Sequence, residues 1–220
     1  MQTVAVLGAG GHASVAIDLL RTLGNYTIVG VYDDVKRGHH AGVPIIGTLD
    51  DAAASPCDAH VIAIGDDRAR RRVHERLSAL PWATLIHPRS IVSQSSQIGE
   101  GSVVCAGAVI QTGARIGAHC IANTSCNIDH GSIVNAFSSV GPACTVCGDV
   151  TVGELTFLGA NSTIIQGIRI GDECTIGAGT VVLRNVGDSE TVVGNPARVL
   201  SSAVLRRGHE REECTSERPT

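Results

Sequence analysis

An aliphatic residue recurs at every sixth position of this chain from residue 86 to residue 182, and a small side chain often follows it four positions later. Neither the 3.6-residue period of a helix nor the two-residue period of a strand produces this spacing. A period of six is typical of a parallel β-helix, in which each short strand forms one face of a coil of about 18 residues. Only Ala122 is not Val, Ile or Leu in the series Ile86, Val92, Ile98, Val104, Ile110, Ile116, Ala122, Ile128, Val134, Val140, Val146, Val152, Leu158, Ile164, Ile170, Ile176 and Val182.

Before this repeat, strands and helices alternate as in an α/β fold. We expect strands at 4–7, 28–32 and 60–64, a helix at 14–23 and a basic surface helix at 68–80. The chain is therefore predicted to comprise a Rossmann-like half domain at 1–84, a β-helix at 85–200 and a charged tail at 201–220 that we expect to be disordered.

The composition excludes some classes of function. A net charge of −4 and a pI near 6.1 argue against nucleic-acid or anionic-membrane partners. The start MQTVAVLGAGG lacks the features of a signal peptide, so we expect a cytoplasmic protein whose eight cysteines are reduced. Most cysteines occupy repeat positions shared with Ser, Ala or Gly, and we expect no metal site.

The segment GAGGHA lies where the first strand meets the first helix, at Gly8–Ala13. Backbone amides at such a turn can bind phosphate groups. The segment also matches a G-x-G-x-x-A dinucleotide fingerprint, with Asp33 in the place of the ribose-binding acid, so a dehydrogenase is an alternative. However, about 84 residues provide only half of a dinucleotide fold, which is enough for one nucleotide.

Three stretches carry a resemblance to a known family. They are VAVLGAGGHA at 4–13, NTSCNIDH at 123–130 and VVGNPARVL at 192–200. With the hexapeptide repeat, they resemble the sialic acid O-acetyltransferase and nucleotide-sugar N-acetyltransferase family. The resemblance implies a left-handed β-helix, a homotrimer with active sites between subunits, and acetyl-CoA as co-substrate. It also implies a nucleotide-linked amino sugar as acceptor, which we expect to be a 4-amino-4,6-dideoxyhexose.

The same resemblance suggests individual roles. His130 would be the general base that removes the amine proton, a task that suits histidine because its unperturbed pKa is about 6.5. The family's second histidine falls on Ser139 here, and Ser139, Ala160 and Ala178 would contact acetyl-CoA. The N-terminal domain would bind the nucleotide sugar through Gly10, Gly11, His12, Asp33, Asp34 and Gly65.

The residue after the family's base is typically acidic, but this chain has Gly131 there. Asp149 lies 18 residues beyond Gly131 and should stack beside it one coil later, so we predict that Asp149 supports His130. A solvated turn aspartate is the alternative. Asp129 is nearer in sequence but should point to the opposite face of its strand.

Other interpretations stay open at this stage. The acceptor group can be a sugar hydroxyl, as in sialic acid O-acetylation, and the nucleotide can be UDP, GDP or dTDP. A noncatalytic β-helix that binds a sugar nucleotide is a further alternative, because Gly131 and Ser139 depart from the family pattern. We expect five further histidines, His39, His40, His60, His74 and His119, to lie at the surface.

Overall fold

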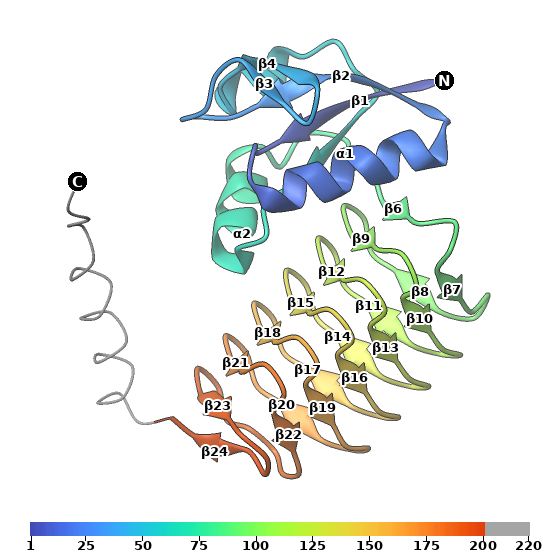
Figure 1. Cartoon of the computed structure of the whole chain (residues 1–220), viewed down its shortest axis with the longest axis vertical. Helices are drawn as coiled ribbons and strands as arrows, with labels where there is room; N and C mark the ends of the chain where they lie inside the picture. The colour runs from blue at the N-terminus through green and yellow to red at the C-terminus, as the bar shows by residue number, and fades with distance from the viewer. Residues whose placement is uncertain (201–220) are drawn as a thin grey trace, which may run out of the picture.

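The computed structural model describes residues 1–200, and the predicted disorder of 201–220 lies outside the described residues. A small α/β domain sits at one end of a long β-helix (Figure 1). Its elements in chain order are β1 (Gln2–Leu7), α1 (Gly11–Leu23), β2 (Tyr26–Tyr32), β3 (His39–His40), β4 (Val43–Gly47), the 3-10 helix η1 (Asp50–Ala54), β5 (Ala59–Ile62) and α2 (Asp67–Arg76).

The sheet of the N-terminal domain has the order β3-β4-β2-β1-β5. Strand β1 pairs in parallel with β2 and β5, and β2 pairs in parallel with β4. The predicted strands and helices are therefore present, whereas the short β3–β4 hairpin was not predicted. Parallel order brings the carboxyl ends of β1, β2 and β5 to one edge, where their loops meet.

The β-helix is built from three sheets of short parallel strands. The first sheet contains β7 (Ile91–Val92), β10 (Val109–Ile110), β13 (Asn127–Ile128), β16 (Thr145–Val146), β19 (Thr163–Ile164) and β22 (Val181–Val182). The second contains β8 (Gln97–Ile98), β11 (Arg115–Ile116), β14 (Ile133–Val134), β17 (Thr151–Val152) and β20 (Arg169–Ile170). The third contains β6 (Leu85–Ile86), β9 (Val103–Val104), β12 (Ile121–Ala122), β15 (Ser139–Val140), β18 (Phe157–Leu158), β21 (Thr175–Ile176), β23 (Thr191–Val193) and the antiparallel β24 (Arg198–Val199).

The pairing register confirms the predicted coil length. Val109 pairs with Asn127, and Asn127 pairs with Thr145, so strands one coil apart are separated by 18 residues. The repeated aliphatic side chains form one continuous core, in which Ile128 and Ile164 are at most 1% exposed. The parallel β-helix predicted from the period of six is therefore confirmed.

The recurring small residues join consecutive coils by hydrogen bonds. The buried hydroxyl of Ser138 donates to the carbonyl of Gly153 at 2.7 Å and accepts from the amide of Thr156 at 3.0 Å. Ser132 repeats the pattern with Cys147 and Val150. Because an unpaired buried peptide group is costly, a small hydroxyl at this position stabilises the turn between two faces.

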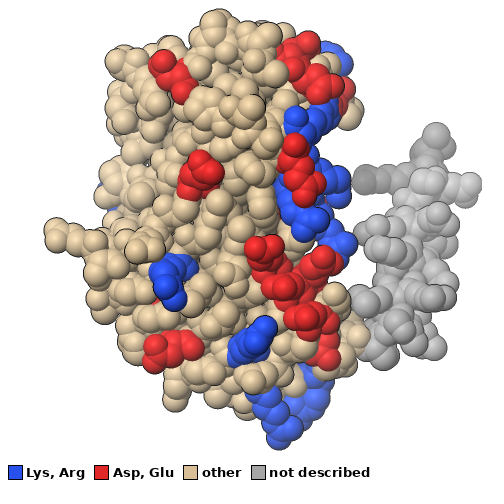
Figure 2. All heavy atoms as spheres, turned by 180° about the vertical axis from the view of Figure 1, so that it is seen from behind, with Lys and Arg blue, Asp and Glu red and all other residues tan. Residues whose placement is uncertain are grey.

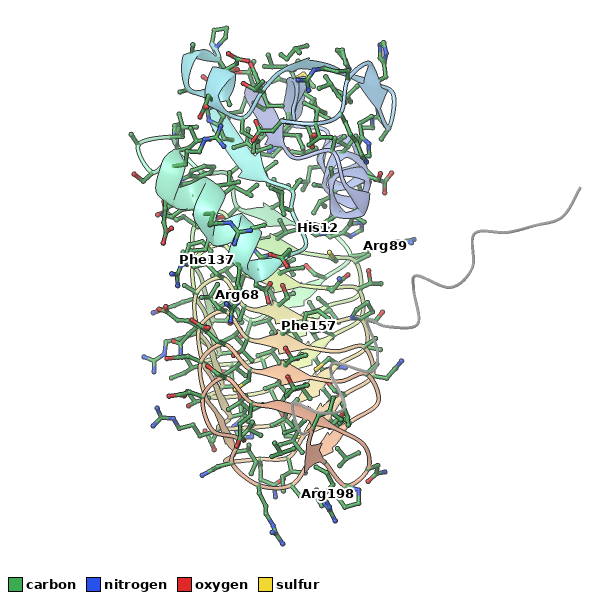
Figure 3. All side chains as sticks on the ribbon, turned by 90° about the vertical axis from the view of Figure 1, so that its left-hand side faces the viewer. His12, Arg68, Arg89, Phe137, Phe157 and Arg198 are labelled. Atoms are coloured by element: carbon green, nitrogen blue, oxygen red, sulfur yellow. The ribbon has the colours of Figure 1, made fainter. Side chains whose placement is uncertain are left out.

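The N-terminal domain packs onto one edge of the β-helix through α2. The turns at 117–120, 135–138, 153–156 and 171–174 connect the second sheet to the third, and we call this edge the α2 corner. Phe137 and Arg68 lie at the junction of α2 with the coils (Figure 3). On the face drawn in Figure 2, acidic and basic side chains are interspersed, with no large area of one sign.

An aromatic cluster fills part of this junction. The ring of His119 stacks on Phe137 at a centroid distance of 5.2 Å and contacts Trp82 and His74 at 5.1 and 4.4 Å. His119 is fully buried and His60 is 1% exposed, so the prediction that both lie at the surface is wrong. The repeat places His119 at a turn, where Phe137 of the next coil stacks on its ring and His74 and Trp82 of the N-terminal domain pack against it.

The buried state of His119 leads to a prediction about acid sensitivity. Burial, and then the nearby charges of His74 and Arg70, lower the pKa of His119 to about 4. In the unfolded chain the value returns to about 6.5, so unfolding takes up protons between these two pH values. The stability that neutral His119 contributes is complete above about pH 6.5 and decreases as the pH falls toward 4.

His119→Phe should therefore reduce the loss of Tm between about pH 6.5 and 4, measured by a thermal scan at each pH. Phenylalanine suits this corner, since Phe137 adopts the same left-handed backbone with φ 58° against 54° at His119. The exposed His39→Phe is the matched control and should leave the acid sensitivity unchanged. If the Tm of His119→Phe decreased with falling pH as steeply as the Tm of the parent, the acid sensitivity would not come from His119.

Candidate functional site

A cavity of about 280 Å³ lies at the carboxyl edge of the parallel sheet, and we call it the loop cavity. It brings together four predicted site residues, Gly10, Asp33, Asp34 and Gly65, with the turn that follows β1. Gly11 opens α1 beside this turn, and Gly10 is the N-cap of that helix. The predicted nucleotide-binding residues therefore converge as parallel-sheet topology requires.

Asp33 shapes the glycine-rich turn. One carboxylate oxygen accepts from the amide of Ala9 at 2.7 Å, and the other accepts from the amides of Val35 and Lys36 at 2.9 and 2.7 Å. The Lys36 ammonium also donates to the carbonyl of Ala9 at 2.6 Å. Desolvation alone would raise the pKa of Asp33, but these amides and Lys36 together lower it below its usual value. Asp33 therefore stays ionised and holds the turn in place.

Asp34 connects the same edge to α2. One of its oxygens accepts from the amide of Leu49 at 2.9 Å, and the other lies 3.2 Å from the guanidinium of Arg76, which also pairs with Asp50. These groups are substantially exposed. Asp34 thus has solvent access at the cavity wall, and Arg76 places a positive charge nearby.

His12 lies in the first turn of α1, beside Gly65 and facing the junction between the domains (Figure 3). Its Nε2 atom is inaccessible and has no hydrogen-bond partner among the described residues. Burial, followed by the positive charge of Arg70, lowers the pKa of His12 to about 4. The ring is therefore neutral near pH 7, with one nitrogen that donates and one that accepts a hydrogen bond.

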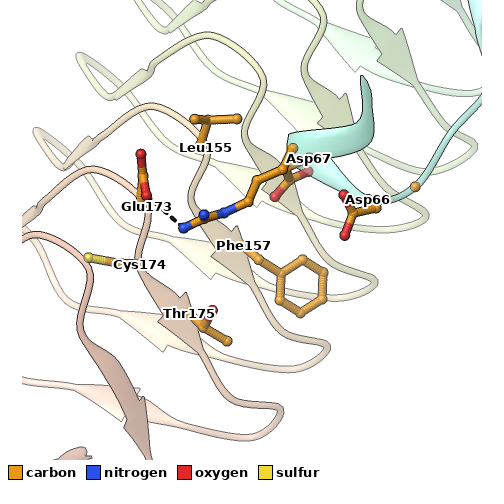
Figure 4. A pocket seen from close by; sticks show the side chains of 9 residues that line it. Asp66, Asp67, Leu155, Phe157, Glu173, Cys174 and Thr175 are labelled. Atoms are coloured by element: carbon orange, nitrogen blue, oxygen red, sulfur yellow. Dashed lines mark hydrogen bonds and ion pairs between the residues drawn. The ribbon is translucent and has the colours of Figure 1, made fainter. Parts of the chain in front are cut away.

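A second cavity of about 350 Å³ lies between α2 and the third sheet (Figure 4), and we call it the interdomain cavity. Arg68 and Glu173 form an ion pair across it at 2.6 Å. Gly65 lines both this cavity and the loop cavity. Sequence reasoning missed the interdomain cavity, because its walls come from segments of two domains with no shared motif. Its lining is Gly65, Asp66, Asp67, Arg68, Leu155, Phe157, Glu173, Cys174 and Thr175.

His130 lies at a different edge, where turns such as 129–132 and 147–150 connect the first sheet to the second. We call this edge the His130 corner. The side chain is exposed, and its ring lies over Gly148 of the next coil, where an added Cβ would overlap the imidazole. The amide of Asp149 donates to the carbonyl of His130 at 2.9 Å. The His130 ring is thus accessible to solvent and lies against the next coil.

The Asp149 carboxylate occupies the space beside Gly131. A Cβ built on Gly131 would overlap the Asp149 Oδ1 atom, and the two residues have φ of 66° and 57°. Within residues 1–200, this carboxylate makes no hydrogen bond to the His130 ring. The stacking predicted from the 18-residue spacing is present, and the support of His130 by Asp149 stays a prediction.

The three residues expected to contact acetyl-CoA lie on two different parts of the β-helix. Ala160 is half-buried and Ala178 is exposed, and they lie on consecutive coils, where the amide of Gly179 donates to the carbonyl of Ala160 at 2.8 Å. Ser139 is 5% exposed and lies under α2, where its hydroxyl donates to Asp67. Its hydroxyl is therefore already bonded within the chain, and its contact with acetyl-CoA stays a prediction.

Within the described residues, no three His, Cys, Asp or Glu side chains are grouped so that they could hold a metal ion. None of the helices in residues 1–200 combines the length and apolarity needed to cross a membrane.

Comparisons with known proteins agree with this architecture. The family model for the PglD N-terminal domain matches residues 3–77, and the model for the hexapeptide repeat of succinyl-transferase matches residues 149–184. The acetyltransferase domain of PglB from Neisseria gonorrhoeae FA1090, solved with acetyl coenzyme A, is 35% identical with a TM-score of 0.87. The match covers 90% of this chain and 99% of that chain. The chain belongs to the nucleotide-sugar N-acetyltransferase family of hexapeptide-repeat proteins.

Two further relatives support this membership. The perosamine N-acetyltransferase of Caulobacter crescentus, solved as a histidine-to-asparagine variant with CoA and GDP-perosamine, is 34% identical with a TM-score of 0.88. That match covers 92% of this chain and 98% of the solved chain. UDP-N-acetylbacillosamine N-acetyltransferase of Bacillus subtilis (strain 168) is 36% identical over 113 residues. This alignment covers 48% of the chain and spans about half, 52%, of that curated relative.

Proposed function

We propose that the chain transfers the acetyl group of acetyl-CoA to the amino group of a nucleotide-linked amino sugar. One observation carries the proposal: both domains together match solved acetyltransferases over nearly their whole lengths, with acetyl coenzyme A bound in one and CoA with GDP-perosamine in the other. The loop cavity would hold the nucleotide through backbone amides at the start of α1. The acceptor would be a 4-amino-4,6-dideoxyhexose.

The chemistry is direct attack on the thioester. The neutral amine attacks the carbonyl carbon, a C–N bond forms and the C–S bond breaks, so that CoA leaves as a thiol or thiolate. His130 would accept the proton that the nitrogen loses. Asp149, one coil away, would stabilise the imidazolium through its negative charge.

The proposal includes a homotrimer with sites between subunits, and the positions of the groups in one chain support it. His130 lies at one corner of the β-helix, Ala160 and Ala178 lie near another edge, and the loop cavity lies in the N-terminal domain. Adjacent prisms would bring groups from different edges together and form a groove for the long CoA arm. A cytoplasmic location is part of the same proposal, and the seven free cysteines of the described part fit a reducing compartment.

The purified protein should release free CoA from acetyl-CoA in the presence of one amino sugar from a panel linked to UDP, GDP or dTDP. Mass spectrometry of the product should show one added acetyl group on nitrogen. The matching sugars with a hydroxyl in place of the amine test the O-acetyltransferase alternative. If no member of the panel is turned over, a noncatalytic sugar-nucleotide-binding protein becomes the better description.

Replacing His130 by Ala should lower kcat by a factor of roughly 10² to 10⁴, because the reaction loses its general base. The side chain is exposed, so the fold and the Tm should be retained. His39→Ala removes another exposed histidine, in the N-terminal domain, and should keep the parent rate. Unchanged turnover in His130→Ala would return His130 to a structural role.

The positions of Gly131 and Asp149 allow a test in which one carboxylate is moved from one coil to the next. Asp149→Gly should lower kcat and change KM little, because it removes the carboxylate from the His130 corner. The double variant Gly131→Asp/Asp149→Gly moves the carboxylate into the neighbouring coil, and aspartate tolerates the left-handed backbone that both positions adopt. It should recover part of the lost rate. A parent-like kcat in Asp149→Gly would show that His130 works without this carboxylate.

The glycine-rich turn provides a test of nucleotide binding. A Cβ built on Gly11 meets no atom within 4 Å, so Gly11→Val has room in the folded protein. It should raise KM for the nucleotide sugar and leave KM for acetyl-CoA unchanged, because the new side chain blocks close approach of the phosphates. Asp18→Val, on the exposed face of α1, is the control. An equal rise in both KM values would indicate misfolding instead.

A further inference from the structure

Arg70 on α2 is the largest fully buried side chain of the described residues, at 1% exposure. A buried guanidinium is costly unless charges and hydrogen bonds compensate for its lost hydration. Such a residue on a helix rich in exposed arginines requires an explanation. We expected a basic surface helix at 68–80, and this expectation is wrong for Arg70, which is buried.

The guanidinium of Arg70 binds both domains at once. Toward the β-helix, its Nε donates to the carbonyl of His119 at 2.7 Å and its Nη2 donates to the carbonyl of Phe137 at 2.9 Å. Toward the N-terminal domain, its Nη1 donates to the carbonyls of Ile64 and Gly65 at 2.9 and 3.2 Å. One side chain thus fixes the loop after β5 against the α2 corner.

Two further side chains complete the arrangement. The Nη2 of Arg70 lies 2.7 Å from Asp67 Oδ1 and 3.1 Å from Ser139 Oγ, and the Ser139 hydroxyl donates to the same Asp67 oxygen. Asp67 and Ser139 are 8% and 5% exposed. Arg70, Asp67 and Ser139 therefore form a buried network of one cation, one carboxylate and one hydroxyl, which we call the Arg70 latch.

The latch holds a segment that lines both cavities. Gly65 contributes to the loop cavity, and Gly65, Asp66 and Asp67 contribute to the interdomain cavity. If this segment moved, the nucleotide end of a bound substrate would move relative to the β-helix. The geometry points to a positioning role beyond simple attachment of the domains.

We propose that the Arg70 latch positions the nucleotide sugar for the reaction, by holding the Gly65–Asp67 segment at a fixed place on the β-helix. This inference rests on the proposed acetyltransferase function. A displacement of about 1 Å between reacting groups can lower a rate by about 10²-fold, so loosening the latch should affect kcat more than binding.

The test compares two latch variants with a neighbour on the same helix. Arg70→Met/Asp67→Asn removes both charges and leaves no unpaired ion in the interior. Ser139→Ala removes only the hydroxyl. Arg71→Met is the control, since Arg71 is 43% exposed and pairs with Glu75 on the surface. Circular dichroism and Tm first show which variants retain the fold.

Each latch variant should lower kcat by about 10- to 100-fold, while the Kd of CoA, measured by calorimetry, stays within about twofold of the parent value. Arg71→Met should match the parent in both. The Ser139→Ala variant separates two roles: a higher Kd for CoA with an unchanged kcat would make Ser139 a coenzyme contact and overturn its place in the latch. An unchanged kcat in both variants would overturn the proposal.

Hydrogen exchange without substrate gives a readout that does not depend on activity. Amides of the 64–70 segment should exchange faster in both latch variants, whereas those of β1 and β2 should not change. Unchanged exchange at 64–70 would also overturn the latch. If the parent turns over no amino sugar, the proposed function fails, but faster exchange would still identify Arg70 as the residue that holds this segment.

Discussion

The stacking of coils 18 residues apart is the constraint on which the rest of this structure depends. It places each residue beside a partner one coil away, and several arrangements in the candidate site are pairs of this kind. Asp149 lies over Gly131, Phe137 stacks on His119, and the turns that carry Ala160 and Ala178 are hydrogen-bonded. A single side chain at one position therefore changes the space available to a residue far away in sequence.

Periodicity explains which features were predictable from the sequence. The strands of the β-helix, the stacking of Asp149 and the convergence of Gly10, Asp33 and Gly65 all follow from a repeat or from parallel-sheet topology. The burial of His119 and Arg70 follows from neither. Both residues lie where the N-terminal domain packs on the α2 corner, and a contact between two aperiodic surfaces leaves no pattern in either segment.

The two departures from the family pattern, Gly131 and Ser139, have similar structural consequences. At Gly131 the missing side chain leaves space that the Asp149 carboxylate fills from the next coil. At Ser139 a small hydroxyl permits the close approach of Asp67 and Arg70 from the N-terminal domain. In both cases a carboxylate from another segment approaches the residue: Asp149 approaches Gly131 and Asp67 approaches Ser139.

The exposure of His130 connects the proposed chemistry to the proposed assembly. An amine that attacks a thioester competes with water, and a base at an open corner would be surrounded by solvent. A neighbouring subunit packed along the His130 corner would exclude water and strengthen the interaction between His130 and the Asp149 charge. The buried latch fixes the loop that lines the loop cavity within one chain, whereas His130, the proposed base, would be enclosed by a second chain of the proposed trimer. Substrate positioning would therefore be set within a subunit, and the environment of the base would be set between subunits.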